Sequence, residues 1–383
     1  MVHACLVTVL RGGFGVFYEN TKGDELNFRQ HHPDKTQLFD PSIDTSTVPA
    51  LFMKDAYPIP PAGFNPDPFT VDAHDRWPYV LQWNMNIQHR LKGNMILEVG
   101  YVGSHGNKLS KRWNLNQARL DTDPLHPTPV SSRVPFPRFG TVLGSFKAGI
   151  SNYNALQVRL ERSFQHGFYF VSGYTYSRCQ DMDSSASFAA DNQNIYDLKG
   201  DYGLCGFQIK NRFNVSGGWE LPIGNNLKGV PAAFVKGWQL NSIVQLQDGS
   251  PFTPRVSGDP ARVGRRYYAR PDRTCDGNLP GDQQTVSRFF DTGCFVQALP
   301  GTFGNSGRNV LLGPGFKSVD FSIFKNFQVT EGLRIQFRTE LFNAFNFSNY
   351  DGPGVSVSSP ATFGVITSEK DAREVQFGLR ITF

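Results

Sequence analysis

The sequence contains no apolar run of the roughly 20 residues that a membrane-spanning helix requires. Apolar residues make up only 39% of the 383 residues, and the mean hydropathy is −0.35. A helical membrane protein is therefore excluded. An intrinsically disordered chain is also excluded, because such chains are poor in aromatic residues, whereas this one is 13% aromatic with 33 Phe and 38 Gly. This composition suits an all-β protein, which could cross a membrane only as a closed barrel.

The sequence also lacks basic blocks, catalytic motifs and metal-binding motifs. Its 38 basic and 33 acidic residues, a net charge of +5, are spread along the chain, so we expect no nucleic-acid partner. No cysteine pair has CxxC spacing, the histidines do not form HExxH, and no GxSxG elbow is present. We therefore expect neither an enzyme nor a bound metal or cofactor.

The N-terminal segment lacks the features of a signal peptide. In MVHACLVTVLRGGFG the apolar run from Ala4 to Leu10 is short, no basic residue precedes it, and no small-x-small cleavage site follows. We interpret this segment as the interior of a strand, so Met1 need not be the start of the natural protein.

What the sequence does contain is strict alternation of apolar and polar residues. Leu333, Ile335, Phe337, Thr339 and Leu341 are separated by single polar residues, and the same period recurs near 81–88, 156–161, 213–221 and 238–247. Because successive side chains of a strand point to opposite faces, each segment has one apolar and one polar face. A soluble sandwich would pack the apolar face on a core, whereas an outer-membrane barrel would turn it to lipid and line its lumen with the polar face.

Ten strands are predicted, and their connections alternate in length. The strands lie near 5–18, 79–91, 95–104, 152–164, 168–178, 210–221, 237–249, 316–327, 333–345 and 373–383. Most are as long as the 9–11 residues of a tilted membrane-crossing strand. The connections near 91–94, 165–167 and 328–332 are short and that at 222–236 is moderate, whereas those near 19–78, 105–151, 179–209, 250–315 and 346–372 are long. Every short connection falls at the end where the chain terminates, which favours an antiparallel transmembrane β-barrel over a sandwich.

Charged residues at the polar positions of these strands are candidates for the lumen wall. They are Arg159, Glu161, Glu220, Arg334, Arg338, Glu340 and Arg380. They could contact a solute directly, or they could pair with one another or hold a plug domain. We favour the second role.

Two disulfides are expected in the long connections, which we predict to be extracellular and therefore in an oxidising environment. Cys275 and Cys294 fall in one predicted loop, Cys179 and Cys205 fall in another, and Cys5 is left over. Each bridge would be worth roughly 3 kcal/mol in the chain-entropy model. The segment 180–203 also offers carboxylates that could bind calcium, but we expect solvated loop carboxylates. They are Asp181, Asp183, Asp191, Asp197 and Asp201.

Seven stretches resemble, in the same order along nearly the whole chain, the C-terminal barrel of TonB-dependent outer-membrane transporters of the Oar-like group. They are RGGFGVFYEN (11–20), EVGYVGSHGNKL (98–109), YNALQVRLERSFQHGFYFVSGYTYSR (153–178), GWQLNSIVQLQDGSPFTP (237–254), GTFGNSGRNVLLGPG (301–315), LRIQFRTELFNAFNFSNY (333–350) and REVQFGLRITF (373–383). The resemblance implies a barrel of about 22 strands with a plug domain inside it, often preceded by a carboxypeptidase-regulatory-like module.

The resemblance also implies that residues 1–383 form the C-terminal part of such a barrel, about ten of its strands. The family's signal peptide, regulatory-like module, plug and TonB box have no counterpart here, so the TonB complex could act only through the missing N-terminal plug region. We expect the barrel part of an energy-coupled importer of a large or scarce solute in the bacterial outer membrane. The alternative is a surface adhesion or receptor scaffold that binds a partner through long extracellular loops.

The last strand resembles the family's signal for the barrel-assembly machinery. Val375, Phe377, Leu379, Ile381 and Phe383 alternate with other residues up to the end of the chain. Adding an exposed strand to a sheet edge supplies main-chain hydrogen bonds, and side-chain pockets supply specificity. In a finished barrel this strand would pair with the first one, which leaves no open edge.

Overall fold

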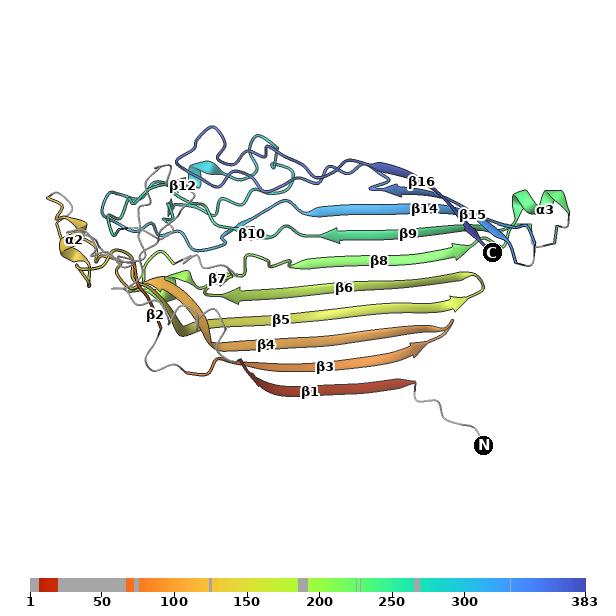
Figure 1. Ribbon diagram of the computed structural model, residues 1–383, viewed down its shortest axis with the longest axis horizontal. Helices are drawn as coiled ribbons and strands as arrows, with labels where there is room; N and C mark the ends of the chain where they lie inside the picture. Colours follow the sequence, from red (N-terminus) through yellow and green to blue (C-terminus); the bar gives the residue numbers. More distant parts are fainter. Residues whose placement is uncertain are drawn as a thin grey trace, which may run out of the picture.

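The computed structural model describes residues 7–19, 67–71, 76–123, 126–184, 192–224, 226–227, 229–264, 269–330 and 332–383. Ten long strands form one antiparallel sheet and follow one another in chain order (Figure 1). They are β1 (Thr8–Tyr18), β3 (Tyr79–Leu91), β4 (Met95–Asn114), β5 (Leu143–Gln165), β6 (Phe168–Asp181), β8 (Asn211–Glu220), β9 (Trp238–Gln247), β14 (Phe316–Gln328), β15 (Arg334–Phe342) and β16 (Glu374–Thr382). The predicted all-β antiparallel fold and its ten strands are confirmed.

Smaller elements surround this sheet. The short strand β2 (Phe69–Val71) pairs in parallel with β5, and β7 (Gly203–Leu204) pairs with β6. Within the described residues, the α-helices α2 (Val130–Arg133) and α3 (Val230–Val235) are four and six residues long. No helix in the described ranges is long and apolar enough to cross a membrane.

Every short connection between the long strands lies at one end of the sheet, here called the turn end. These connections are 92–94, 166–167, 221–237 and 329–333. The long connections, 19–78, 115–142, 182–210, 248–315 and 343–373, all start and finish at the opposite, loop end. Figure 1 shows the loop end on the left and the turn end, with the C-terminus, on the right. The predicted asymmetry of the connections is confirmed.

Residues with positive φ close two of these turns. Gly93 and Asn94 have φ of 75° and 59°, and His166 and Gly167 have φ of 54° and 77°. Two consecutive positive φ values give a hairpin the twist that its strands need. A Cβ on Gly167 would lie 2.7 Å from the carbonyl oxygen of Glu220, so glycine is also required there by close packing.

The register of the strands joins the apolar positions into one continuous surface, here called the apolar face. Paired residues of neighbouring strands point to the same side of a sheet. One row across the apolar face contains Leu10, Ile87, Val99, Val158, Tyr174, Phe213 and Leu246. Another contains Trp219, Leu240, Ile323, Thr339 and Phe377.

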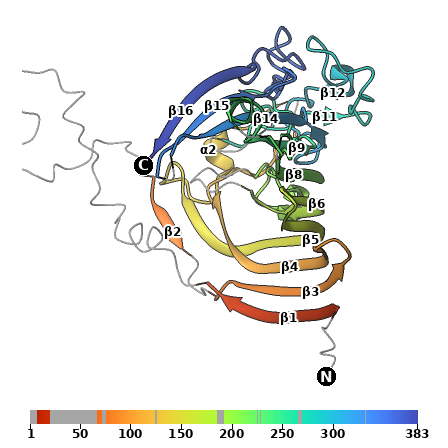
Figure 2. The same ribbon diagram turned by 90° about the vertical axis from the view of Figure 1, so that its right-hand side faces the viewer.

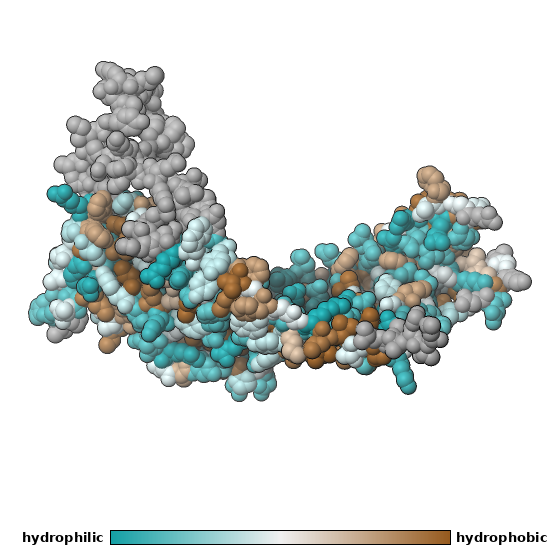
Figure 3. All heavy atoms as spheres, turned by 90° about the horizontal axis from the view of Figure 1, so that it is seen from below, coloured by the Kyte–Doolittle hydropathy of each residue, from teal (hydrophilic) through white to brown (hydrophobic). Residues whose placement is uncertain are grey.

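The opposite side, here called the polar face, is concave. Viewed along the strands, the sheet forms an open arc (Figure 2). A hollow of about 610 Å³ is lined from strands β3 to β9, chiefly by polar-face residues such as Asn86, Gln157, Thr175, Asn214 and Gln245. A convex surface could not bring six neighbouring strands around one hollow, so the polar face is on the inside of the arc. Seen from below, the molecule is hollowed between its loop end and its turn end (Figure 3).

The arc is not closed. β1 and β16 stand at the two margins of the sheet, and each has one long-strand partner within the described residues. Phe377 is 67% exposed and Phe383 is 99% exposed, so the apolar side chains of the last strand are uncovered. An open edge with exposed apolar side chains is the arrangement that pairs with further strands.

Two strands extend further than the sequence predicts. Residues 105–114 and 143–151 were expected in a loop, but they continue the β4–β5 pairing beyond a register shift between Gly106 and Leu109. Lys108 has a φ of 55° at this bulge, which interrupts the alternation by which strands are recognised. Beyond it Trp113 is buried and stacks on Phe146 with ring centroids 4.3 Å apart.

The β15 strand is shorter than predicted. It ends at Phe342 because Asn343 and Asn346 have φ of 48° and 54° and turn the chain. The side-chain amide of Asn343 donates to the carbonyl oxygen of Phe347 over 2.8 Å, so the turn is also held by a hydrogen bond.

The connections 248–315 and 343–373 fold together into a compact unit, here called the loop head. Its core contains Phe289, Phe290, Cys294, Phe295, Leu311, Phe363 and Ile366. Two short ladders support it, β10 (Pro251–Phe252) with β13 (Leu311–Leu312) and β11 (Asp272–Arg273) with β12 (Phe295–Val296). The ring of Phe290 meets that of Phe363 edge-on at 5.1 Å. The long connections are therefore ordered by their own apolar core.

The longest of the connections at the turn end, 221–237, covers a lysine. Lys325 occupies an apolar-face position opposite Trp238 and Phe337 and is only 4% exposed. Its ammonium donates to the carbonyl oxygens of Ala233, over 2.7 Å, and of Lys236, at the C-terminal end of α3. Since a helix C-terminus carries partial negative charge, α3 supplies the acceptors that a cation on an apolar surface needs.

Candidate functional site

The seven charged residues proposed for the lumen wall all lie on the polar face. Glu340 pairs with Gln376, Arg338 with Gly378 and Arg334 with Thr382, all at polar-face positions, and Arg380 lies opposite Gln336. Arg159 and Glu161 occupy the same face of β5, and Glu220 occupies it on β8. The structure separates them into a group on β5, a group on β15 and β16, and Glu220 near the turn end.

The group on β5 contains an ion pair. Arg159 Nη2 lies 2.6 Å from Glu161 Oε2, and Arg159 Nη1 lies 4.0 Å from Glu98 Oε2. Asn86 Nδ2 also donates to Glu98 Oε1. The side chain of Arg159 is 50% exposed, and exposed pairs of this kind contribute only about 0–1 kcal/mol. The pair therefore shapes the surface of the hollow more than it stabilises the fold.

The group on β15 and β16 is cationic. Arg338 Nε donates to Gln336 Oε1 over 2.7 Å, and its guanidinium lies 4.9 Å from the Phe324 ring. Arg334 and Arg380 line a hollow of about 350 Å³ with Gln328, Gln336 and Thr382. Within the described residues none of these three arginines has a carboxylate within 4.0 Å. Arg334 Nε instead donates to Gln328 Oε1 over 3.2 Å.

Glu220 lies on β8 at the turn end, where it shares a hollow with Arg334 of the second group. This hollow has a volume of about 840 Å³ and is also lined by His166, Lys236 and Gln239. The sequence expectation that the seven charges mostly pair with one another applies, among the described contacts, to Arg159 and Glu161 alone. The assignment of the seven to a lumen stays a prediction.

A buried network of charges that sequence analysis missed lies at the loop end. Asp201 is fully buried, and its carboxylate lies 3.0 Å from Arg270 Nη1 and 3.6 Å from Lys111 Nζ. Arg308 donates from Nη2 to Asp181 and from Nε to the carbonyl oxygen of Asp201. The network joins β4, the connection 182–210 and the loop head. The sequence shows no spacing pattern for this network, because its members are far apart along the chain.

Two of the expected solvated aspartates belong to this network, so that expectation was wrong for them. Asp181 is 6% exposed and Asp201 is 0% exposed. A carboxylate buried to this degree has to be paired, and the partners here are cationic side chains, Arg308 for Asp181 and Arg270 with Lys111 for Asp201. Asp197 is exposed and accepts from the backbone N–H of Gly200, and Asp191 lies outside the described residues. No group of three potential metal ligands occurs among the described residues.

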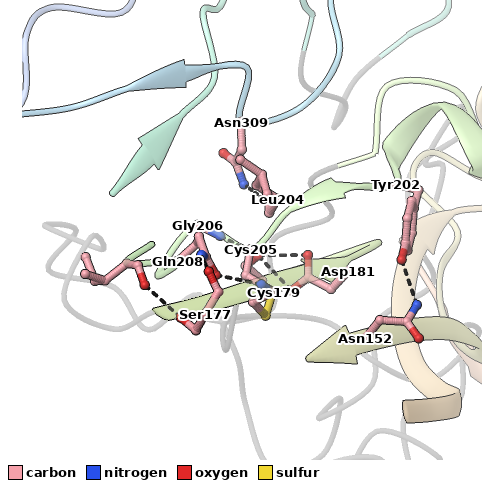
Figure 4. Close-up of a disulfide and its surroundings, with 12 residues drawn as sticks. Asn152, Ser177, Cys179, Asp181, Tyr202, Leu204, Cys205, Gly206, Gln208 and Asn309 are labelled. Atoms are coloured by element: carbon pink, nitrogen blue, oxygen red, sulfur yellow. Dashed lines mark hydrogen bonds between the residues drawn. A yellow bond between two sulfur atoms is a disulfide. The ribbon is translucent and has the colours of Figure 1, made fainter. Parts of the chain in front are cut away.

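Both expected cysteine pairs are joined by disulfides in the structure. Cys179 is bonded to Cys205, and Cys275 to Cys294. Figure 4 shows the first bridge, where Gln208 accepts from the backbone N–H of Cys179 and donates to the carbonyl oxygen of Ser177. Cys179 lies within β6 and not in a loop as predicted. Cys5 lies outside the described residues.

The connection between β4 and β5 is fastened at its tip by Asp121. The hydroxyl of Thr128 donates to this carboxylate over 2.9 Å, and that hydrogen bond, with others from the backbone, lowers the pKa of Asp121. Since the folded pKa is below the unfolded one, the tip is stabilised above the ordinary aspartate pKa and loses that stabilisation as the pH falls through the folded value.

A family model and several solved structures are similar to this chain. The family model described as "Outer membrane beta barrel domain" matches residues 6–376. Similar solved structures include FpvA of P. aeruginosa bound to heterologous pyoverdines (12% identity, TM-score 0.41, covering 80% of this chain and 28% of that one). Another is the outer membrane transporter YddB from Escherichia coli, with 12% identity and a TM-score of 0.44, covering 82% of this chain and 34% of that one. The FrpB iron transporter from Neisseria meningitidis has 10% identity and a TM-score of 0.40, covering 82% of this chain and 32% of that one.

The chain spans about a third of the length of these structures. No curated protein sequence matches it.

The buried network predicts a large effect of one neutralising substitution. Asp201→Asn keeps the shape of the side chain but leaves Arg270 and Lys111 without their carboxylate, and breaking a buried pair costs about 3–5 kcal/mol. We expect much faster amide hydrogen exchange in residues 192–210 and in the loop head. The matched control is Asp276→Asn, since the Asp276 side chain is 74% exposed in its pair with Arg273. Equal protection in the two variants would contradict a stabilising role of the network.

Proposed function

The chain belongs to the outer-membrane β-barrel family, and on that premise we propose that it forms part of the barrel wall of a TonB-dependent transporter that imports a large or scarce solute. As a member of this family it is a protein of the bacterial outer membrane. The apolar face then contacts hydrocarbon, the turn end lies in the periplasm and the loop end lies outside the cell. This arrangement satisfies the main-chain hydrogen bonds of the crossing strands within the sheet, as a bilayer requires.

One observation carries the proposal. The polar face is concave and holds charged groups beside a hollow of about 610 Å³, while the continuous apolar face is on the outside of the arc. A wall with this curvature encloses a water-filled passage when the barrel is complete. The cationic group of Arg334, Arg338 and Arg380 lies on the same concave face, so the passage would be charged near its periplasmic end.

The open margins of the sheet support a larger barrel. β1 and β16 have unpaired edges within the described residues, and a transmembrane barrel has no open edge. Residues 1–383 would therefore be the C-terminal part of the wall, joined at both margins by further strands. In the resembling family the TonB complex acts through an N-terminal plug region, which we place in those additional parts of the protein.

A surface adhesion or receptor scaffold is the second candidate function. The loop head favours it, because two long connections share an aromatic core and a disulfide between Cys275 and Cys294. An ordered external unit of this kind can present a binding surface whether or not transport follows. Dependence on the TonB complex separates the two candidates, since adhesion needs no energy coupling.

Uptake by the complete natural protein in a deletion strain tests the transport proposal. We expect Arg338→Glu to reduce the uptake rate about tenfold or more, because a reversed charge would alter a passage lined by three arginines, while the amount of assembled barrel stays unchanged. Arg288→Glu on the loop head, where Arg288 is 57% exposed, is the control and should transport normally.

Removal of the TonB complex should abolish uptake altogether. If Arg338→Glu leaves both assembly and uptake unaffected, Arg338 does not face the passage. Partner binding that persists without the TonB complex, together with no uptake in its presence, would favour the scaffold.

The barrel-assembly machinery is the partner proposed for the last strand. Phe383 is 99% exposed, so its truncation should cost the folded sheet almost nothing. Loss of assembled protein from the outer membrane in Phe383→Ser, by at least about fivefold at equal synthesis, would thus report recognition and not folding. The matched control is Phe207→Ser, an exposed phenylalanine at the loop end. Equal outer-membrane amounts of both variants and the unaltered protein would refute the assignment.

A further inference from the structure

A pocket at the loop end has the composition of an anion-binding site. It has a volume of about 300 Å³ and lies where the connection 182–210 meets the loop head. Three arginines line it, namely Arg255, Arg270 and Arg308, and none of the described lining residues is acidic. Pro251, Phe252 and Val355 supply an apolar wall.

Arg270 is buried with its hydrogen-bonding capacity only partly used. The residue is 5% exposed. Its Nη1 donates to Asp201 and its Nη2 to the carbonyl oxygen of Gly200, while Nε has no partner although it is buried. A guanidinium has five N–H donors, so more than half of them lack a described acceptor. Leaving a buried charged donor unpaired is costly, and Arg270 is one of the residues that line the pocket.

The buried charges at this place are also unequal. Among the described residues of this network, the charged ones that are at least nine-tenths buried are Lys111, Arg270, Arg308, Asp181 and Asp201. Three cations therefore face two carboxylates in a region of low dielectric. An uncompensated buried charge is strongly unfavourable, and an anion in the pocket would balance the group.

The neutral polar groups of the pocket are already occupied. Thr253 Oγ1 donates to Asn309 Oδ1 and accepts from the backbone N–H of Asn309. Ser184 Oγ accepts from Arg308 and donates to Asp181. A ligand would therefore meet guanidinium groups on one side and apolar side chains on the other. Planar guanidinium donors match a carboxylate, and the apolar wall suits a short hydrocarbon or aromatic body.

We propose that this pocket binds the carboxylate group of a small organic acid, or of a larger solute that ends in one. The carboxylate accepts from Arg270 and Arg308, and the body of the ligand packs on Phe252 and Val355. The pocket would be the outer receptor site for the imported solute, a role that rests on the proposed function, whereas carboxylate binding rests on the pocket alone.

The test is titration of the complete natural protein in detergent micelles with 4-fluorobenzoate, followed by fluorine NMR. We expect saturable binding that weakens at least about tenfold in Arg270→Gln, because charge-assisted hydrogen bonds are lost. Since Arg270→Gln also disturbs the pair with Asp201, a second variant is needed. Val355→Trp fills the pocket from its apolar wall without touching the charge network, and it should weaken binding to a similar degree.

Controls identify what is bound. Arg288→Gln removes an exposed arginine of the loop head and should bind normally. Inorganic phosphate should displace the probe only weakly, since it cannot use the apolar wall. Non-saturable binding, equal binding in both pocket variants, or phosphate displacement as strong as that by benzoate would overturn the proposal.

Uptake measured in parallel separates the two proposals. Saturable binding without uptake of any solute supports the pocket and counts against import. If the unaltered protein does not bind the probe and Val355→Trp still takes up solute, the proposed pocket is wrong and the import proposal stands.

Discussion

The register of the ten long strands is the constraint on which the rest of the structure depends. Side chains alternate with a period of two, so a slip of one residue in any strand would exchange its apolar and polar faces. The observed pairing keeps Leu10, Val158 and Leu246 on one side and Gln157, Arg212 and Gln247 on the other. Main-chain hydrogen bonds across such a sheet are satisfied internally, as the proposed contact of its apolar face with lipid requires.

The loop end is stabilised by different interactions from those of the sheet. The described parts of the connections 182–210, 248–315 and 343–373 are held by an aromatic core around Phe290, by two disulfides and by the buried charges of Asp201, Arg270 and Lys111. Buried ion pairs contribute little net stability, but they form only when the geometry of the charged groups is close to ideal. These interactions give the loop end a defined surface. The donors of Arg270 that lack a described acceptor support the ligand proposed there.

The sequence predicted the sheet well and the loop end poorly, for a physical reason. A two-residue period can be read from Leu333 to Leu341 because both environments of a strand, lipid and water, act on each residue separately. Contacts between Arg308 and Asp181, 127 positions apart, leave no local pattern. Residues 105–114 were missed because the bulge at Lys108 interrupts the alternation. The alternation of the strand predicts that Arg338 lies on the polar face. It does not predict the hydrogen bond to Gln336 or the stacking on Phe324.

The central claim is that the apolar face lies against hydrocarbon and the polar face against water. The most direct measurement places a nitroxide label at each of residues 156–159 in turn, in the complete protein reconstituted in bilayers, and compares collisions with oxygen and with a water-soluble nickel complex. The account predicts that labels at Leu156 and Val158 collide with oxygen and those at Gln157 and Arg159 with nickel. Accessibility without a two-residue period, or with the opposite phase, would contradict it.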